Sequence, residues 1–65
     1  MVPDIDIWRC AALMIRHYGD LADLEAATRA DEFLAKGELG GQRVWMRIAK
    51  AVEDLRTVKP GETSQ

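Results

Sequence analysis

Glycine divides this 65-residue chain into three segments of similar length. The first break is Gly19, and the second covers residues 37–41, with glycine at 37, 40 and 41. Because glycine has no Cβ atom, it adopts left-handed backbone conformations at little cost and commonly follows the last turn of a helix. None of the segments shows the apolar–polar alternation of a β-strand. The sequence therefore predicts an all-α fold, a three-helix bundle with short glycine-containing turns.

The helix ends follow from the residues beside these breaks. We expect the first helix to cover residues 4–18, with Asp4 as its N-cap, and Asp20 to be the N-cap of the second helix. The third helix is expected to begin between residues 39 and 42 and to reach about residue 56.

The chain is expected to be one small domain, with the three helices in residues 1–57 and a disordered C-terminal tail in residues 58–65. A chain of this length buries only about 60% of the surface that its unfolded state exposes, and such domains often gain stability from disulfides, metals or oligomerisation. Cys10 is the single cysteine and His17 the single histidine, so an intramolecular disulfide is excluded and no zinc site is expected. Helix packing and self-association therefore remain as the expected sources of stability.

Charge and hydropathy narrow the class of protein. The formal net charge is -2 at pH 7, whereas nucleic-acid-binding domains usually carry a basic excess. No uninterrupted apolar run approaches the ~20 residues of a membrane-spanning helix, and the first residues lack the basic and apolar regions of a signal peptide. The sequence therefore predicts a cytoplasmic protein without membrane contact.

Each predicted helix has one apolar face. At about 100° per residue, the three faces contain Ile7, Ala11, Met14, Ile15 and Tyr18; Ala22, Ala26, Ala27, Ala30, Phe33 and Leu34; and Val44, Trp45, Ile48, Ala49, Val52 and Leu55. Because small side chains let helices approach closely, we expect the alanine-rich second helix at the centre, with antiparallel neighbours. Trp8 and Trp45 are expected to cover its opposite ends, and Gly41 to approach the core without a side chain.

Asp31 is the carboxylate for which the sequence predicts a structural contact. It lies beside the apolar face of its helix, and a partly buried carboxylate needs a partner. Arg29 is expected on the opposite, polar face, paired with Glu25 four residues earlier. The partner of Asp31 should therefore be a backbone N–H at the start of the third helix, or an ion pair with Arg9, Arg16 or Arg43.

Cys10 and His17 make a poor catalytic pair. They lie about 10 Å apart along a helix axis, whereas a nucleophile and its base must be within hydrogen-bond reach. We interpret them as a thiol at the edge of the core and a solvated histidine at a helix end. The sequence predicts no enzyme, no cofactor, no metal site and no small-molecule substrate.

Basic residues gather on one side of the third helix, at Arg43, Arg47 and Lys50. Residues 20–36 carry five acids and two bases, whereas residues 40–59 carry five bases and two acids. One interpretation is a recognition helix in a DNA groove. Others are a solvated face, or a strip that contacts an acidic protein surface such as the second helix of another copy. The acidic neighbouring helix would repel phosphate, which favours the latter two.

Leu13 and Met46 are apolar residues on the polar faces of their helices. Leu13 is a candidate for a dimer patch, and Met46 is a further candidate for partner contact. The preferred hypothesis is a small non-enzymatic protein-interaction module, as a homodimer. The alternative is a small nucleic-acid-binding or regulatory protein that uses the basic side of the third helix.

Four short patterns extend across residues 4–56. They are Asp6-Ile7-Trp8-x-x-Ala11-Ala12, Ile15-x-x-Tyr18-Gly19, Ala26-x-x-Arg29-Ala30-Asp31 and Gly37-x-x-x-Gly41-x-x-x-Trp45-x-x-Ile48-x-x-Ala51-Val52. In these patterns the chain resembles a family of small, uncharacterised bacterial proteins. The resemblance implies a small all-helical protein, and it carries over no activity, ligand or site residue.

Overall fold

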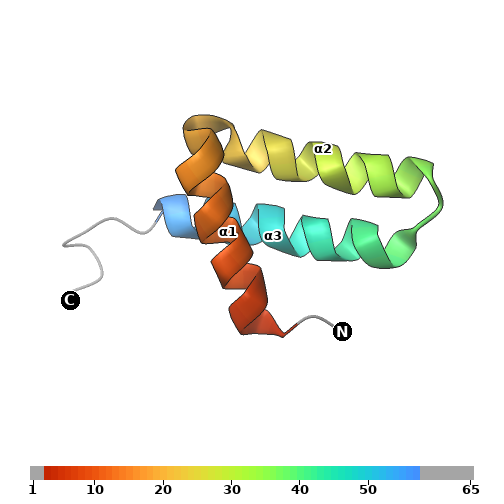
Figure 1. The fold of residues 1–65 in the computed structure, drawn as a ribbon, viewed down its shortest axis with the longest axis horizontal. Helices are drawn as coiled ribbons and strands as arrows, with labels where there is room; N and C mark the ends of the chain where they lie inside the picture. The colour runs from red at the N-terminus through yellow and green to blue at the C-terminus, as the bar shows by residue number, and fades with distance from the viewer. Residues whose placement is uncertain (1–2, 58–65) are drawn as a thin grey trace.

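Three α-helices make up the described part of the chain, residues 3–57 of a computed structural model (Figure 1). They are α1 (Asp4–Tyr18), α2 (Ala22–Ala35) and α3 (Leu39–Thr57), and a short 3-10 turn, η1 (Gly19–Leu21), joins the first two. Residues 3–57 contain no strand, and the all-α, three-helix prediction is confirmed. The predicted tail, residues 58–65, lies outside the described residues.

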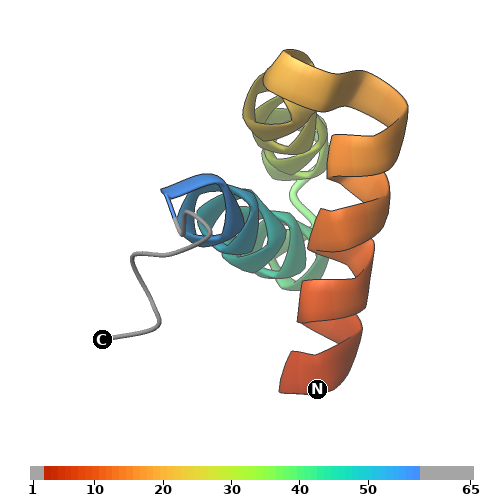
Figure 2. The same cartoon turned by 90° about the vertical axis from the view of Figure 1, so that its left-hand side faces the viewer.

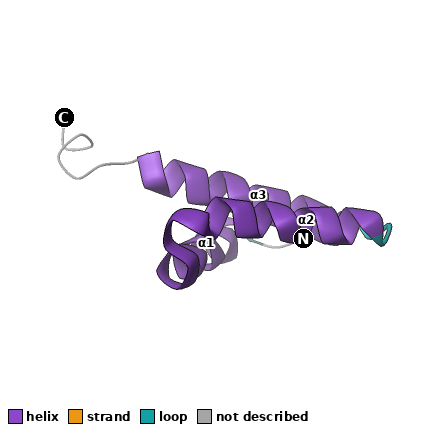
Figure 3. Cartoon of the chain, turned by 90° about the horizontal axis from the view of Figure 1, so that it is seen from above, coloured by secondary structure: helices purple, strands orange, loops and turns teal. Residues whose placement is uncertain are grey.

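The α2 and α3 helices lie side by side and run antiparallel, and α1 crosses one face of this pair (Figures 1 and 2). Figure 3 shows the arrangement from above, with α1 on one side of the α2–α3 layer. The antiparallel prediction is thus confirmed for α2 and α3 and is wrong for α1. Within residues 3–57, no helix covers the other face of the layer, which we call the open face.

The α3 helix, rather than the alanine-rich α2 helix, is the centre of the fold. It packs against both other helices, and α1 contacts α3 more extensively than it contacts α2. The buried residues of α3 include Ile48 and Val52, whereas those of α2 are all alanines, at positions 22, 26 and 30. Because alanines bury little apolar area, they give α1 less to pack against than the larger side chains of α3.

Two glycines end helices in left-handed conformations, as predicted. Gly19 follows α1 with φ of 56°, and Gly37 follows the end of α2 with φ of 75°. Beyond α2, the N–H of Glu38 donates to the carbonyl oxygen of Phe33 (2.9 Å), and the N–H of Gly37 donates to that of Leu34 (3.0 Å). These two bonds form a Schellman motif, which satisfies the last carbonyls of α2 where the chain reverses.

The helix N-termini differ from the prediction. Pro3 rather than Asp4 occupies the N-cap of α1, and Asp20 lies within η1 rather than at the N-cap of α2. Neither helix start has a side-chain capping hydrogen bond. Asp4 instead pairs with Arg47 of α3, and Asp20 lies near Arg56 of α3. These carboxylates therefore connect separate helices instead of satisfying the backbone at their own helix starts.

The buried core is small and rich in alanine. It consists of Ile7, Ala11, Met14, Ala22, Ala26, Ala30, Ile48, Ala51 and Val52. Trp45 is half-buried against it, but Trp8 is 41% exposed. Trp8 lies about 100° around α1 from Ile7, so it borders α3 at the edge of the crossing. The prediction that Trp8 covers one end of α2 is therefore wrong.

Several members of the predicted apolar faces are exposed. They are Tyr18, Ala27, Leu34 and Leu55. The α2–α3 layer has α1 on one face only, so the apolar face of α2 extends beyond its contact with α3. The sequence consequently predicts more core residues than the three helices bury.

Gly41 marks a close approach between α2 and α3. A Cβ atom at Gly41 would lie 2.5 Å from Cδ1 and 2.8 Å from Cγ of Phe33. Because Cγ is the base of the ring, relief of this overlap would require the whole Phe33 side chain to move. Gly41 thus makes the predicted close helix approach without a side chain, and its neighbour is the half-buried Phe33 rather than a residue of the buried core.

We predict that Gly41→Ala lowers the free energy of unfolding by about 1–3 kcal/mol, since the added methyl group overpacks the contact with Phe33. Urea unfolding followed by circular dichroism measures this change. Gly40→Ala is the matched control, because a Cβ at Gly40 meets nothing within 4 Å. Alanine is the better helix former, so Gly40→Ala should be neutral or stabilise the protein by up to about 1 kcal/mol. Equal effects of the two substitutions would contradict the close-approach explanation.

Candidate interaction surfaces

Ion pairs within the chain involve two residues of the predicted basic strip of α3, which consists of Arg43, Arg47 and Lys50. Arg47 pairs with Asp4 of α1, and Lys50 Nζ lies 3.8 Å from Asp54 Oδ1. Arg43 is exposed on the same helix. Two of the three basic residues predicted for partner contact thus already face carboxylates of the same chain, which weakens the field that they present to an external anion.

A shallow hollow of about 220 Å³ lies between α1 and α3 beside these ion pairs. It is lined by Asp4, Ile7, Trp8, Arg47, Lys50, Ala51 and Asp54. The lining contains two acids and two bases, so it carries no net charge to select a charged ligand. Trp8 is the largest apolar side chain of this lining.

A second hollow of about 280 Å³, which we call the α2–α3 groove, lies between these helices. It is lined by Ala27, Ala30 and Asp31 of α2 and by Gln42, Met46 and Ala49 of α3. Ala49 is two residues from Ala51, which borders α1, so the two side chains point to nearly opposite sides of α3. The groove is therefore on the open face.

Asp31 is exposed and lines this groove. None of the ion pairs or side-chain hydrogen bonds formed within residues 3–57 includes it. The predicted burial and structural ion pair are therefore wrong. The reason is that none of the helices in residues 3–57 packs on the open face. The apolar face of α2 beside Asp31 is therefore exposed to solvent and does not contact a helix with an arginine.

Leu13 and Met46 lie on separate surfaces. Leu13 is 50% exposed on α1, and Met46 is 54% exposed on α3, where it lines the groove. Gln42 Nε2 donates a hydrogen bond to Met46 Sδ (2.7 Å) along the same helix. The structure thus brings Met46 together with Asp31 but not with Leu13, so the two apolar residues belong to two different candidate surfaces.

Arg29 is a contact residue that sequence reasoning assigned to the wrong side of α2. It forms the predicted pair with Glu25 (3.2 Å), but its guanidinium also lies over the rings of Tyr18 and Trp45, 5.9 and 5.3 Å from their centroids. Nη2 donates to the Tyr18 hydroxyl (2.9 Å). Arg29 therefore joins α2 to the end of α1 and to α3. Its i,i+4 acid suggested a solvent-facing pair, and no local pattern indicated the two distant rings.

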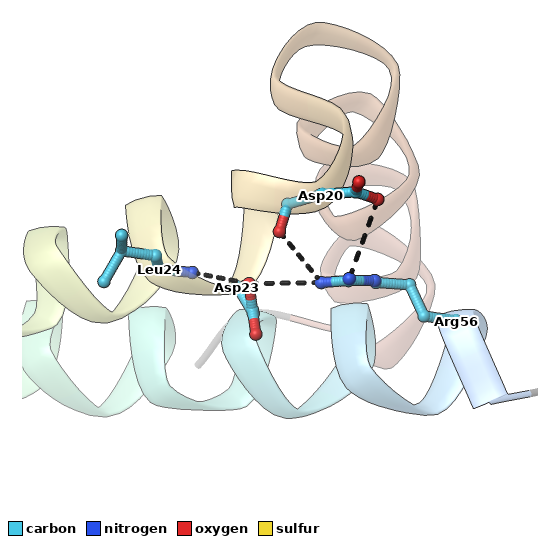
Figure 4. Close-up of polar contacts among 4 residues, drawn as sticks. All are labelled: Asp20, Asp23, Leu24 and Arg56. Carbon is cyan, nitrogen blue, oxygen red and sulfur yellow. Dashed lines mark hydrogen bonds and ion pairs between the residues drawn. The ribbon is translucent and has the colours of Figure 1, made fainter.

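Arg56 is a second connecting residue absent from the predicted set (Figure 4). Nη1 lies 3.1 Å from Asp23 Oδ1 and donates to the carbonyl oxygen of Asp20 (3.3 Å), while Nη2 lies 3.8 Å from Asp20 Oδ1. The same Asp23 oxygen accepts the N–H of Leu24 (2.8 Å), as Figure 4 shows. The last turn of α3 is thereby attached to the turn between α1 and α2.

Cys10 and His17 lie in different surroundings on α1. Cys10 is half-buried beside the core, and His17 is exposed at the end of α1. Across residues 3–57, no three His, Cys, Asp or Glu side chains gather in a way that could hold a metal ion. No helix in the same range is both long enough and apolar enough to cross a membrane.

Comparison with known proteins adds no assignment to these surfaces. No protein-family model, curated protein or solved structure matches the chain. The resemblance to a bacterial family therefore stays a prediction.

We predict that Arg29→Ala lowers the free energy of unfolding by about 1 kcal/mol or more, because it removes a hydrogen bond and two ring contacts that join three helices. Arg29→Lys should restore only part of this loss, since an ammonium group lacks the planar donor set. Glu32→Ala, at an exposed position of the same helix, is the control and should change stability little. Full recovery with lysine would show that charge alone, rather than stacking, supplies the stabilisation.

Proposed function

We propose that this chain is a non-enzymatic protein-interaction module that binds a helical partner on the open face of α2 and α3. The observation that carries this proposal is the residue spacing on that face. The positions are Leu24, Ala27, Asp31 and Leu34 on α2, and Leu39, Gln42, Met46, Ala49 and Glu53 on α3. On both helices the intervals alternate between three and four residues, which is the repeat of a helix–helix packing seam.

The exposed apolar side chains support the same proposal. Five of the nine buried apolar residues among residues 3–57 are alanines. By contrast, Met46 in the groove is exposed, as are Leu24, Leu34 and Leu39, which helical spacing places on the same face. Each of these four is at least 50% exposed. A grouped set of exposed apolar residues rimmed by polar ones is typical of a protein-interaction site. The partner that fits is a helix, or a helix pair, with an apolar stripe of its own.

The alternative is nucleic-acid binding through the basic side of α3. The ion pairs of Arg47 with Asp4 and of Lys50 with Asp54 give it less support, because binding a phosphate would compete with both. Duplex DNA of random sequence tests this class at low salt, by fluorescence anisotropy. Salt-sensitive binding that is lost in the Arg43→Glu/Arg47→Glu variant would favour the alternative.

We predict that Leu34→Glu and Met46→Glu each abolish cross-linking of this chain to protein in its native host, because a charge on the seam opposes burial of the face. Leu13→Glu is the matched control, since Leu13 has the same exposed fraction as Leu34, 50%, on a different helix. Cross-linking in cells followed by denaturing purification detects both self-contacts and contacts with other proteins. Loss of cross-linking in the Leu13 variant alone would move the interaction to α1, and its absence in the wild-type protein would refute the proposed function.

A further inference from the structure

We propose that the partner on the open face is a second copy of this chain, so that two α2–α3 pairs form a four-helix bundle with an α1 helix on each outer side. This inference rests on the proposed function and names its partner. Since α1 lies on the opposite face of the layer, it leaves the approach of a second layer unobstructed (Figure 2).

The shape of the open face is complementary to itself. Small residues, Ala27, Ala30 and Ala49, line the α2–α3 groove. Larger apolar side chains lie on the same two stripes, with Leu34 on α2 and Met46 on α3, both about half exposed. In a symmetric dimer, the larger residues of each copy have a groove of small residues to occupy on the other. The three-and-four spacing on both helices is the geometry that such interdigitated packing requires.

Charge selects one of two symmetric arrangements. Asp31 of α2 gives the groove an acidic residue, whereas α3 carries an exposed base, Arg43, next to the groove residue Gln42. A twofold axis perpendicular to the helices would place α2 against α2, with acid facing acid. A twofold axis parallel to the helices places α2 of one copy against α3 of the other, with acid facing base. The second arrangement is favoured, because like charges placed across an interface oppose binding.

This arrangement identifies a specific contact between the copies. A twofold axis parallel to the helices preserves position along them, and Asp31 lies beside Gln42 and Met46 in its own groove. Asp31 therefore comes to the level of Arg43 of the second copy, which is one residue from Gln42. The pairing gives Asp31 the arginine that it lacks among the described residues of its own chain. Both α2–α3 turns also lie at the same end of the dimer.

We predict that sedimentation equilibrium over a concentration series shows a dimer of the wild-type chain. Asp31→Arg and Arg43→Asp should each weaken dimerisation about tenfold or more by placing like charges together, and the double variant should recover most of the affinity. Arg16→Asp is the control, because it makes the same change of charge at an exposed position of α1, and it should leave dimerisation unchanged. Met46→Glu should abolish the dimer, while circular dichroism confirms that the variant stays helical.

The direction of the two copies has its own measurement. A spin label at Glu38→Cys in a Cys10→Ser background reports the distance between the two turns. Turns at the same end give a short distance, whereas turns at opposite ends give about 28 Å or more, because α3 has 19 residues with a rise of about 1.5 Å each. A long distance, or failure of the charge reversal to restore affinity, would overturn the arrangement.

Failure of self-association is distinguishable from failure of the proposed function. A wild-type chain that stays monomeric at high micromolar concentration, yet cross-links to another protein through Leu34 and Met46, overturns the homodimer and retains the interaction module. A dimer that is lost in Leu13→Glu but not in Met46→Glu overturns the inference in favour of an α1 interface. A monomer that cross-links to nothing overturns both.

Discussion

The contact between the small-residue side of α2 and the face of α3 determines the rest of this structure. Ala22, Ala26 and Ala30 are the buried residues of α2, and Gly41 of α3 approaches Phe33 so closely that a Cβ atom would not fit. Small side chains permit this approach, but each buries little apolar area. Because burial stabilises by about 25 cal/mol per Å² of apolar surface, each alanine contributes little free energy. The α2–α3 pair is thus held together by short-range packing, and the larger buried side chains come from α1 and α3.

The position of α1 follows from where the larger buried side chains lie. Ile48 and Val52 provide the buried apolar surface on α3. The helix α1 packs across this surface with the face that contains Ile7 and Ala11. Polar contacts then fix its two ends: Asp4 pairs with Arg47 near the start, and Arg29 reaches Tyr18 at the end. The ion pairs are partly exposed and contribute modestly. Their main effect is to define where α1 crosses.

A single helix cannot cover both faces of a two-helix layer, and this constraint creates the open face. The uncovered side retains an apolar stripe on each helix, and Asp31 lies between alanines there without a partner among residues 3–57. On the side that α1 covers, Arg47 and Lys50 of α3 instead form ion pairs with Asp4 and Asp54. The same asymmetry therefore favours a protein partner on one face and reduces the charge available for phosphate on the other.

The sequence by itself determined the local structure. Glycine at 19 and 37 ends helices because these positions require left-handed backbone, and Gly41 was identified as a packing position because its helix turns it toward a neighbour. Helical periodicity also predicted most of the buried residues. These features depend on backbone conformation and on side chains within a few residues, so they can be read without knowledge of the fold.

Only the tertiary structure decided which of two helices is central, where α1 crosses, and which apolar residues remain exposed. Leu34 belongs to the predicted apolar face of α2 and Trp8 is predicted to cover one end of α2, yet both side chains stay at the surface. Asp4 and Asp20 face arginines of α3 rather than capping helices. Arg29 and Arg56 connect elements that are far apart in the chain. The periodicity of a helix gives the direction of each side chain around its axis. The way the helices cross determines which neighbour each side chain contacts. That crossing depends on many small contacts between segments that are distant in the sequence.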